Sequence, residues 1–145
     1  MFQHILLPTD GSDIAAAMTA KTLAFARSCG ARVTALHVVL DFHTLTYHTD
    51  MLADTRQRYE QESAAHARAL LDEVCKAARE QGVPCESLVV QAAQPHEAIV
   101  RTARDRGCDL ICIATHGRHG IKGLLLGSET QKVLAHSEIP VLVLR

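Results

Sequence analysis

The chain has 145 residues, 48% of them hydrophobic and 21% charged, and its formal net charge is −1. These values are typical of one soluble domain spanning 1–145, and the net charge argues against a strongly basic nucleic-acid-binding protein. No apolar run approaches the length needed to span a bilayer. Because no signal-peptide pattern opens the chain, we expect a cytoplasmic protein that binds neither nucleic acid nor membranes.

Strand-like and helix-like segments alternate along the chain. Continuous apolar runs predict strands covered on both faces, and the segments between them have helical character and end at glycine or before proline. In chain order we predict a strand at His4–Leu7, a helix at Asp13–Cys29, a strand at Leu36–Leu40, a helix at Thr55–Gln81, a strand at Leu88–Val90, a helix at Pro95–Arg106, a strand at Leu110–Ile113, a helix at Ser128–His136 and a strand at Val141–Leu144.

This alternation predicts an α/β fold, with a mostly parallel sheet, right-handed crossovers and helices on both faces. A ligand of such a sheet binds at the carboxyl ends of the strands, where the strand order reverses. The segment from Asp41 to Asp54 has no clear period, and a functional lid and a variable surface insert both stay open for it. The long helix after it is expected to bury Ala64, Ala65, Ala69, Leu70, Val74 and Ala77.

The connection after the fourth predicted strand has the layout of a phosphate-binding loop. It runs from Ala114 through Gly117 to Gly127-Ser128, where the next helix is expected to begin. Glycine lets the backbone approach a ligand, and the first turn of a helix presents unpaired N–H groups to an anion. Ser128 is expected to cap that helix or to bind a phosphate oxygen. A purely structural strand–loop–helix connection is the alternative.

Three ordered blocks resemble the universal stress protein family across essentially the whole chain. They are Pro8-Thr9-Asp10-Gly11-Ser12 after the first strand, the loop that ends in Gly127-Ser128, and the final strand at Val141–Leu144. The resemblance implies a Rossmann-like, adenine nucleotide alpha hydrolase-like fold, with a five-stranded open sheet of order 3-2-1-4-5. It also implies a cytoplasmic stress-response module that binds an adenine nucleotide and forms a homodimer through the last strand. A last strand covered by the chain's own loops is the alternative to that dimer.

The resemblance places the nucleotide at residues that match the family's binding positions. Asp10 would lie by the adenine and ribose, and the backbone of Val38 would meet the adenine edge. A turn or capping role for Asp10 and a core role for Val38 are the structural alternatives. Arg118 and Lys122 would add positive charge, or remain solvated. The implied site is Pro8, Thr9, Asp10, Val38, Ile113, Ala114, His116, Gly117, Arg118, Gly127, Ser128, Glu129 and Thr130.

Two positions depart from the family pattern. Ala114 stands where the nucleotide-binding pattern begins with glycine, so its methyl group would crowd the ligand unless φ is negative there. Glu129 stands where an apolar residue is common, and its carboxylate would repel a phosphate unless it points away. The predicted ligand is ATP, with ADP or AMP as alternatives, and Mg²⁺ is expected only with the nucleotide.

Two other functions stay open. A slow ATP hydrolase would use Asp10 and His116, but without a Walker-type loop or a dedicated catalytic constellation its turnover would be weak. A family member that has lost nucleotide binding would act as a dimeric interaction protein. A response regulator is excluded because no carboxylate ends the third strand at Val89–Ala92, and a dinucleotide oxidoreductase is excluded because G-x-G-x-x-G is missing after the first strand.

The cysteines and histidines are interpreted as structural. No cysteine pair has C-x-x-C spacing, so free thiols in a reducing compartment are predicted, with a redox sensor at Cys29 or Cys108 as the alternative. The histidines are scattered without a metal-binding spacing, so no metal site is predicted. The cysteines are Cys29, Cys75, Cys85, Cys108 and Cys112.

Overall fold

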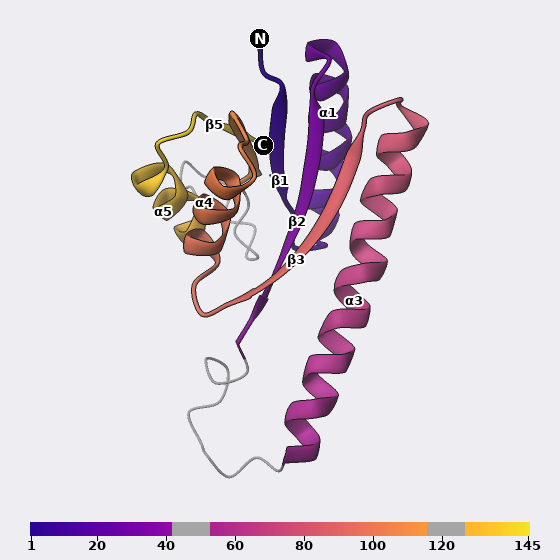
Figure 1. The fold of residues 1–145 in the computed structure, drawn as a ribbon, viewed down its shortest axis with the longest axis vertical. Helices are drawn as coiled ribbons and strands as arrows, with labels where there is room; N and C mark the ends of the chain where they lie inside the picture. Colours follow the sequence, from indigo (N-terminus) through magenta and orange to yellow (C-terminus); the bar gives the residue numbers. More distant parts are fainter. Residues whose placement is uncertain (42–52, 116–126) are drawn as a thin grey trace.

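The computed structural model of the protein describes residues 1–41, 53–115 and 127–145. Strands and helices alternate in it as the sequence predicts (Figure 1). The strands are β1 (His4–Pro8), β2 (Arg32–Leu40), β3 (Cys85–Ala92), β4 (Leu110–Ala114) and β5 (Val141–Leu144). The helices are α1 (Asp13–Cys29), α3 (Ala53–Glu80), α4 (Pro95–Asp105) and α5 (Ser128–His136).

The strands form one five-stranded sheet of order β3-β2-β1-β4-β5, and every neighbouring pair is parallel. The predicted fold class and strand order are therefore confirmed. Helices α1 and α3 lie on one side of the sheet, and α4 and α5 lie on the other (Figure 1). Both faces of the sheet are covered, which is the arrangement that continuous apolar strands require.

Two hydrophobic clusters, one on each side of the sheet, form the core. Ile5 and Leu7 of β1 pack with α1 and α3, whereas Leu6, between them, packs with α4 and α5. Successive strand side chains point to opposite faces, so one short apolar run serves both clusters. Leu6 is fully buried, and burying a side chain of this size stabilises the fold by about 1.5–3 kcal/mol.

The boundaries of α1 follow from its flanking residues. Ser12 is the N-cap and its hydroxyl accepts the N–H of Ala15 at 3.1 Å. The helix ends at Gly30, whose φ of 69° is left-handed and suits glycine. Both ends agree with the predicted helix.

The buried face of α3 agrees with the predicted stripe only in part. Val74 is buried as predicted, and Ala64, Leu70 and Ala77 are half-buried, whereas Ala65 and Ala69 are exposed. The structure also buries Ala67, Leu71 and Ala78. Alanines occur on several faces of this helix, so the sequence pattern does not select one of them. Packing against the sheet selects the face that carries Leu71, which is 1% exposed.

The strands also extend beyond their apolar runs. β2 begins at Arg32 rather than Leu36, and β3 begins at Cys85 rather than Leu88. The register Val33 with Cys85 through Leu40 with Ala92 holds these added residues in the sheet. Backbone pairing with a neighbour extends a strand through polar positions, and no local pattern reports that pairing.

Candidate functional site

The carboxyl ends of β2, β1 and β4 meet at the point where the strand order reverses. β1 pairs with β2 on one side and with β4 on the other. Pro8 ends β1 opposite Leu36, and the N–H of Thr9 donates to the Leu36 carbonyl at 2.9 Å. Open parallel sheets bind their ligands at such a position.

The turn from β1 into α1 is held by its own polar side chains. Asp10 Oδ1 accepts the N–H of Ser12 at 3.0 Å, and Thr9 Oγ1 accepts the N–H of Gly11 at 3.4 Å. Gly11 has a φ of 79°, and a Cβ there would lie 3.2 Å from a methyl group of Leu70. Glycine is therefore required at this turn. Asp10 has the turn-stabilising role that the sequence offered as the alternative to nucleotide binding.

His37 links β2 to this turn and was not selected from the sequence. Its Nδ1 lies 2.9 Å from the carbonyl oxygen of Thr9, so Nδ1 carries the proton and donates it. The ring also lies edge-on to His66 of α3, with the centroids 6.2 Å apart. Nothing local in the sequence signals this partner, because His37 is in β2 and Thr9 lies in the turn after β1. The next residue, Val38, is half-buried and packs against the cluster beneath α4 and α5.

The end of β4 places two predicted residues at the same edge. Ile113 is 8% exposed, and Ala114 is half-buried at the last position of the strand. No described non-glycine residue has a positive φ, so the methyl group of Ala114 causes no backbone strain. The predicted residues His116, Gly117 and Arg118, together with Lys122, lie outside the described residues.

The start of α5 corrects the predicted role of Ser128 as a cap. Gly127 is the N-cap, and its carbonyl accepts the N–H of Gln131 at 3.0 Å, whereas Ser128 is already helical and exposed. Because glycine has no side chain, no side-chain cap is made there. Thr130, in the same first turn, is 5% exposed.

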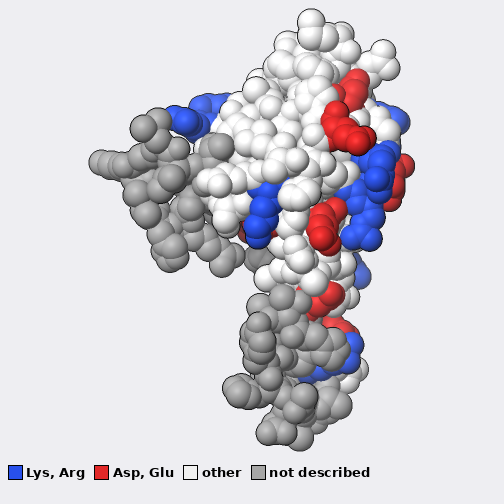
Figure 2. Space-filling model, turned by 90° about the vertical axis from the view of Figure 1, so that its left-hand side faces the viewer, with Lys and Arg blue, Asp and Glu red and all other residues white. Residues whose placement is uncertain are grey.

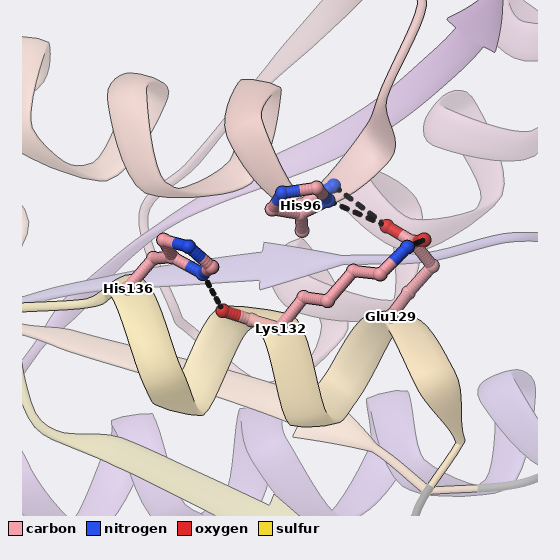
Figure 3. A network of polar contacts seen from close by, with 4 residues as sticks. All are labelled: His96, Glu129, Lys132 and His136. Atoms are coloured by element: carbon pink, nitrogen blue, oxygen red, sulfur yellow. Dashed lines mark hydrogen bonds and ion pairs between the residues drawn. The ribbon is translucent and has the colours of Figure 1, made fainter.

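Glu129 is turned toward α4 (Figure 3). Its Oε2 accepts the backbone N–H of His96 at 2.9 Å and lies 3.2 Å from Nδ1 of the same residue. Its Oε1 accepts a hydrogen bond from Lys132 at 3.1 Å. Burial opposes ionisation of the carboxyl, but the bonds from Lys132 and His96 outweigh it and hold the pKa of Glu129 below its usual value. Both carboxylate oxygens are thus bonded to protein groups.

An open groove of about 400 Å³ runs along α4 beside the end of α5. Arg101 and Arg104 line it together with Glu97, and on this side of the molecule blue basic and red acidic side chains are interspersed (Figure 2). None of its lining residues belongs to the implied nucleotide site. Its mixed charge favours no ligand class, and we assign it no function.

The described ranges were also compared with the requirements of metal sites and membrane spans. They contain no group of three or more His, Cys, Asp or Glu side chains arranged to hold a metal ion. In the same ranges, no helix combines the length and the apolar composition needed to cross a membrane.

Comparison with known proteins gives a consistent result. The Universal stress protein family model matches residues 1–145. A universal stress protein of Thermus aquaticus is 35% identical, with 100% of both chains covered. The universal stress protein MJ0577 of Methanocaldococcus jannaschii is 30% identical over 100% of this chain and 96% of its own.

Solved structures agree with these relatives. The structure of MJ0577 superposes with a TM-score of 0.83 at 29% identity, covering 99% of this chain and 96% of that one. A universal stress protein in complex with cAMP superposes with a TM-score of 0.73 at 23% identity, covering 99% and 97%. With the parallel sheet and strand order described above, these matches show that the chain belongs to the universal stress protein family.

Proposed function

We propose that this universal stress protein binds an adenine nucleotide, ATP in the first place, where β1, β2 and β4 end, and that it acts as a cytoplasmic dimeric regulatory module. The observation that carries the proposal is the meeting of the Pro8-Thr9-Asp10 turn, Val38 and Ala114 at the switch point of the sheet. The neighbour with cAMP shares only the fold at its 23% identity, so the proposal depends on this chain's own residues.

Each element of the proposed site has a separate role. The turn at Asp10 and the backbone of Val38 would face the adenosine, and Ile113 and Ala114 would form the floor between them. The phosphates would lie at the start of α5, against Gly127, Ser128 and Thr130, because the first turn of a helix offers unpaired N–H groups. His116, Gly117 and Arg118 would complete the cradle, and Mg²⁺ would enter with the nucleotide.

Glu129 takes a different role in this proposal from the one the family pattern implies. With both oxygens bonded to His96 and Lys132, its carboxylate supports the orientation of α5 against α4. It is therefore a positioning residue and not a ligand contact. Two features of the sequence argued that this chain has lost nucleotide binding, the methyl group of Ala114 and the carboxylate of Glu129. Both arguments are weakened, because φ of Ala114 is not positive and the Glu129 carboxylate is bonded to His96.

The hydrolase alternative gains no support from the described site. Asp10 Oδ1 accepts the Ser12 N–H, so this oxygen already has a structural role. A hydrolase needs a group that orients or deprotonates a water molecule beside the γ-phosphate. Nucleotide binding without dedicated catalysis is therefore the function that we propose.

The test is calorimetric titration of nucleotide-stripped protein with Mg·ATP, and then with ADP and AMP. Gly127 has φ −56° and ψ 148°, which other residues adopt, so Gly127→Val crowds the site without straining the backbone. Ala135→Val, at the exposed far end of α5, is the matched control. We expect binding that is lost in Gly127→Val and kept in Ala135→Val. The absence of heat and of thermal stabilisation at millimolar ATP would overturn the proposal.

The proposed dimer rests on β5, which ends the described part of the sheet beside β4. Its four residues are all half-buried within the chain. An edge strand presents unpaired backbone groups, and antiparallel pairing with a second copy would cover them through a two-fold contact. The proposed partner is thus a second copy of this chain, joined through Val141–Leu144.

A further inference from the structure

Two of the cysteines lie in contact, although their spacing in the sequence gives no sign of a pair. The Sγ atoms of Cys75 and Cys85 are 3.3 Å apart, and both residues are free and partly exposed. Of the other three, Cys108 and Cys112 are buried, and Cys29, the last residue of α1, is partly exposed. We propose that Cys75 and Cys85 are an oxidation site, a dithiol that a low-molecular-weight disulfide converts into an intramolecular disulfide bond.

Ordered backbone holds the two thiols together. Cys75 is in the last part of α3 and Cys85 is the first residue of β3. Between them the chain turns at Gly82, with φ 71°, and the N–H of Val83 bonds the Ala78 carbonyl at 2.9 Å. The register of Cys85 with Val33 fixes the start of the strand. A disulfide bond is about 2.05 Å long, so small side-chain rotations must bring the sulfur atoms closer by about an ångström.

Burial and the neighbouring Cys75 thiol raise the pKa of Cys85 to about 12. Cys85 is therefore a poor nucleophile near neutral pH, and we assign the first attack to Cys75. The Cys75 thiolate attacks one sulfur of the small disulfide, forms a mixed disulfide and releases one small thiolate, which takes up a proton.

The second step closes the protein disulfide. The Cys85 thiolate attacks the Cys75 sulfur and displaces the second small thiol. In sum, two protein thiols lose two hydrogens, and the small disulfide is reduced to two thiols. Because the Cys75 thiol is consumed in the first step, its contribution to the raised pKa of Cys85 disappears and burial remains. The second step should therefore accelerate as the pH rises.

The disulfide would join the end of α3 to the beginning of β3. The proposed nucleotide site lies where β1, β2 and β4 end, at the opposite end of the parallel strands. Oxidation should therefore leave nucleotide affinity unchanged, and this inference does not depend on the proposed function. Closing a covalent loop reduces the freedom of the unfolded chain, so the oxidised protein should melt at a higher temperature.

The experiment incubates the folded full-length protein with oxidised glutathione across a pH series, blocks the remaining thiols by alkylation and maps the peptides by mass spectrometry. We expect two of the five thiols to be lost together, a decrease of about 2 Da in the intact mass before alkylation, and a disulfide-linked Cys75–Cys85 peptide. Cys85→Ser should stop at a mixed disulfide on Cys75. Cys108→Ser, the matched control, should still form the disulfide.

Three results would overturn the proposal. The first is a stable mixed disulfide in the parent protein, and the second is a disulfide that maps to Cys29 or Cys112. The third is retention of all five thiols in the folded protein while the unfolded protein is fully oxidised. Peptide mapping of the parent is decisive by itself, so the test stands even if Cys85→Ser fails to fold.

Discussion

Glu129 of α5 caps α4 by accepting the backbone N–H of His96 at 2.9 Å. The N-cap residue of α4 itself, Gln94, makes no side-chain cap bond, and Pro95 has no N–H to satisfy. His96 is thus the first donor of this helix that needs a partner, and it finds one on another helix. The contact joins α5 to α4 and engages the carboxylate of Glu129 with protein groups.

Replacing Glu129 with alanine removes this cap from α4. We expect the free energy of unfolding to fall by about 1 kcal/mol, the usual cost of losing a helix N-cap, measured by chemical denaturation. Glu129→Gln keeps one acceptor oxygen and should cost less. ATP affinity should not change in Glu129→Gln. Tighter ATP binding in that variant would place the carboxylate beside the phosphates and contradict the positioning role.

The same contact makes stability depend on pH in the acid range. The pKa of Glu129 is lowered in the folded protein from a usual value of 4.5. Its contribution is therefore complete above that value and is lost as the pH falls through the folded pKa. Glu129→Gln should remove this part of the pH dependence, whereas Glu73→Gln at an exposed position of α3 should leave it intact.

His4 predicts a second pH dependence, near neutrality. Thr34 donates its hydroxyl proton to Glu86 at 2.8 Å, so His4 Nε2, 2.7 Å from Thr34 Oγ1, must donate to Thr34. His4 Nδ1 then has no proton and, among the described residues, makes no hydrogen bond of ordinary geometry, although the nearby backbone of Arg106 partly favours protonation. Burial, followed by the charge of Arg32, lowers the pKa of His4 from 6.5, so a positive charge on this ring is disfavoured.

We expect the free energy of unfolding to fall as the pH drops below 6.5, since the unfolded chain then binds a proton that the folded His4 does not. Denaturation of the parent and of His4→Gln between pH 8 and 5 measures this, and the variant should show a flatter profile. His66→Gln, which changes an exposed histidine of α3, is the control. Equal slopes in the parent and in His4→Gln would show that His4 is not the titrating group.

Alanine substitutions at Gly11 and Gly82 would distinguish the cost of backbone strain from the cost of steric crowding. Both have left-handed φ, 79° and 71°, but a Cβ at Gly11 meets Leu70 at 3.2 Å, whereas a Cβ at Gly82 meets nothing within 4 Å. Gly82→Ala should cost roughly 1 kcal/mol of stability from strain alone. Gly11→Ala should cost more, and it should also weaken ATP binding because it deforms the turn at Asp10. Equal costs for the two variants would show that Leu70 yields without penalty.

The proposed dimer contact is tested at Val143. The carbonyls of Pro140 and Leu144 accept hydrogen bonds from Ile111 of β4 and from Thr115, the residue after β4. By the two-residue period of a strand, the backbone of Val143 therefore faces away from β4. Val143→Pro removes that outward N–H, whereas Val143→Thr keeps it with a similar shape. Light scattering should report a monomer for the first variant and a dimer for the second. A dimeric Val143→Pro, folded by circular dichroism, would rule out strand pairing.

The amino-acid sequence by itself determined the alternation of strands and helices and the exact limits of α1. These are local properties, because an apolar run, the Ser12 cap and the Gly30 stop act within a few residues of one another. The strand order 3-2-1-4-5 came from the family resemblance and is confirmed by the pairing of the strands. The Pro8-Thr9-Asp10 block was selected by the resemblance and the start of α5 by its glycine-bearing loop, and their role as a nucleotide site stays a prediction.

Only the tertiary structure decided which side chains meet. The predicted stripe of α3 was only partly right, because the face that carries Leu71 is selected by packing against the sheet. The role of Glu129 likewise depends on a contact with His96 of another helix. Even Cys75 and Cys85, ten residues apart, meet because a specific turn returns the chain to the sheet. Such contacts join different elements, and the physical reason that sequence patterns miss them is that local periodicity carries no information about how those elements pack together.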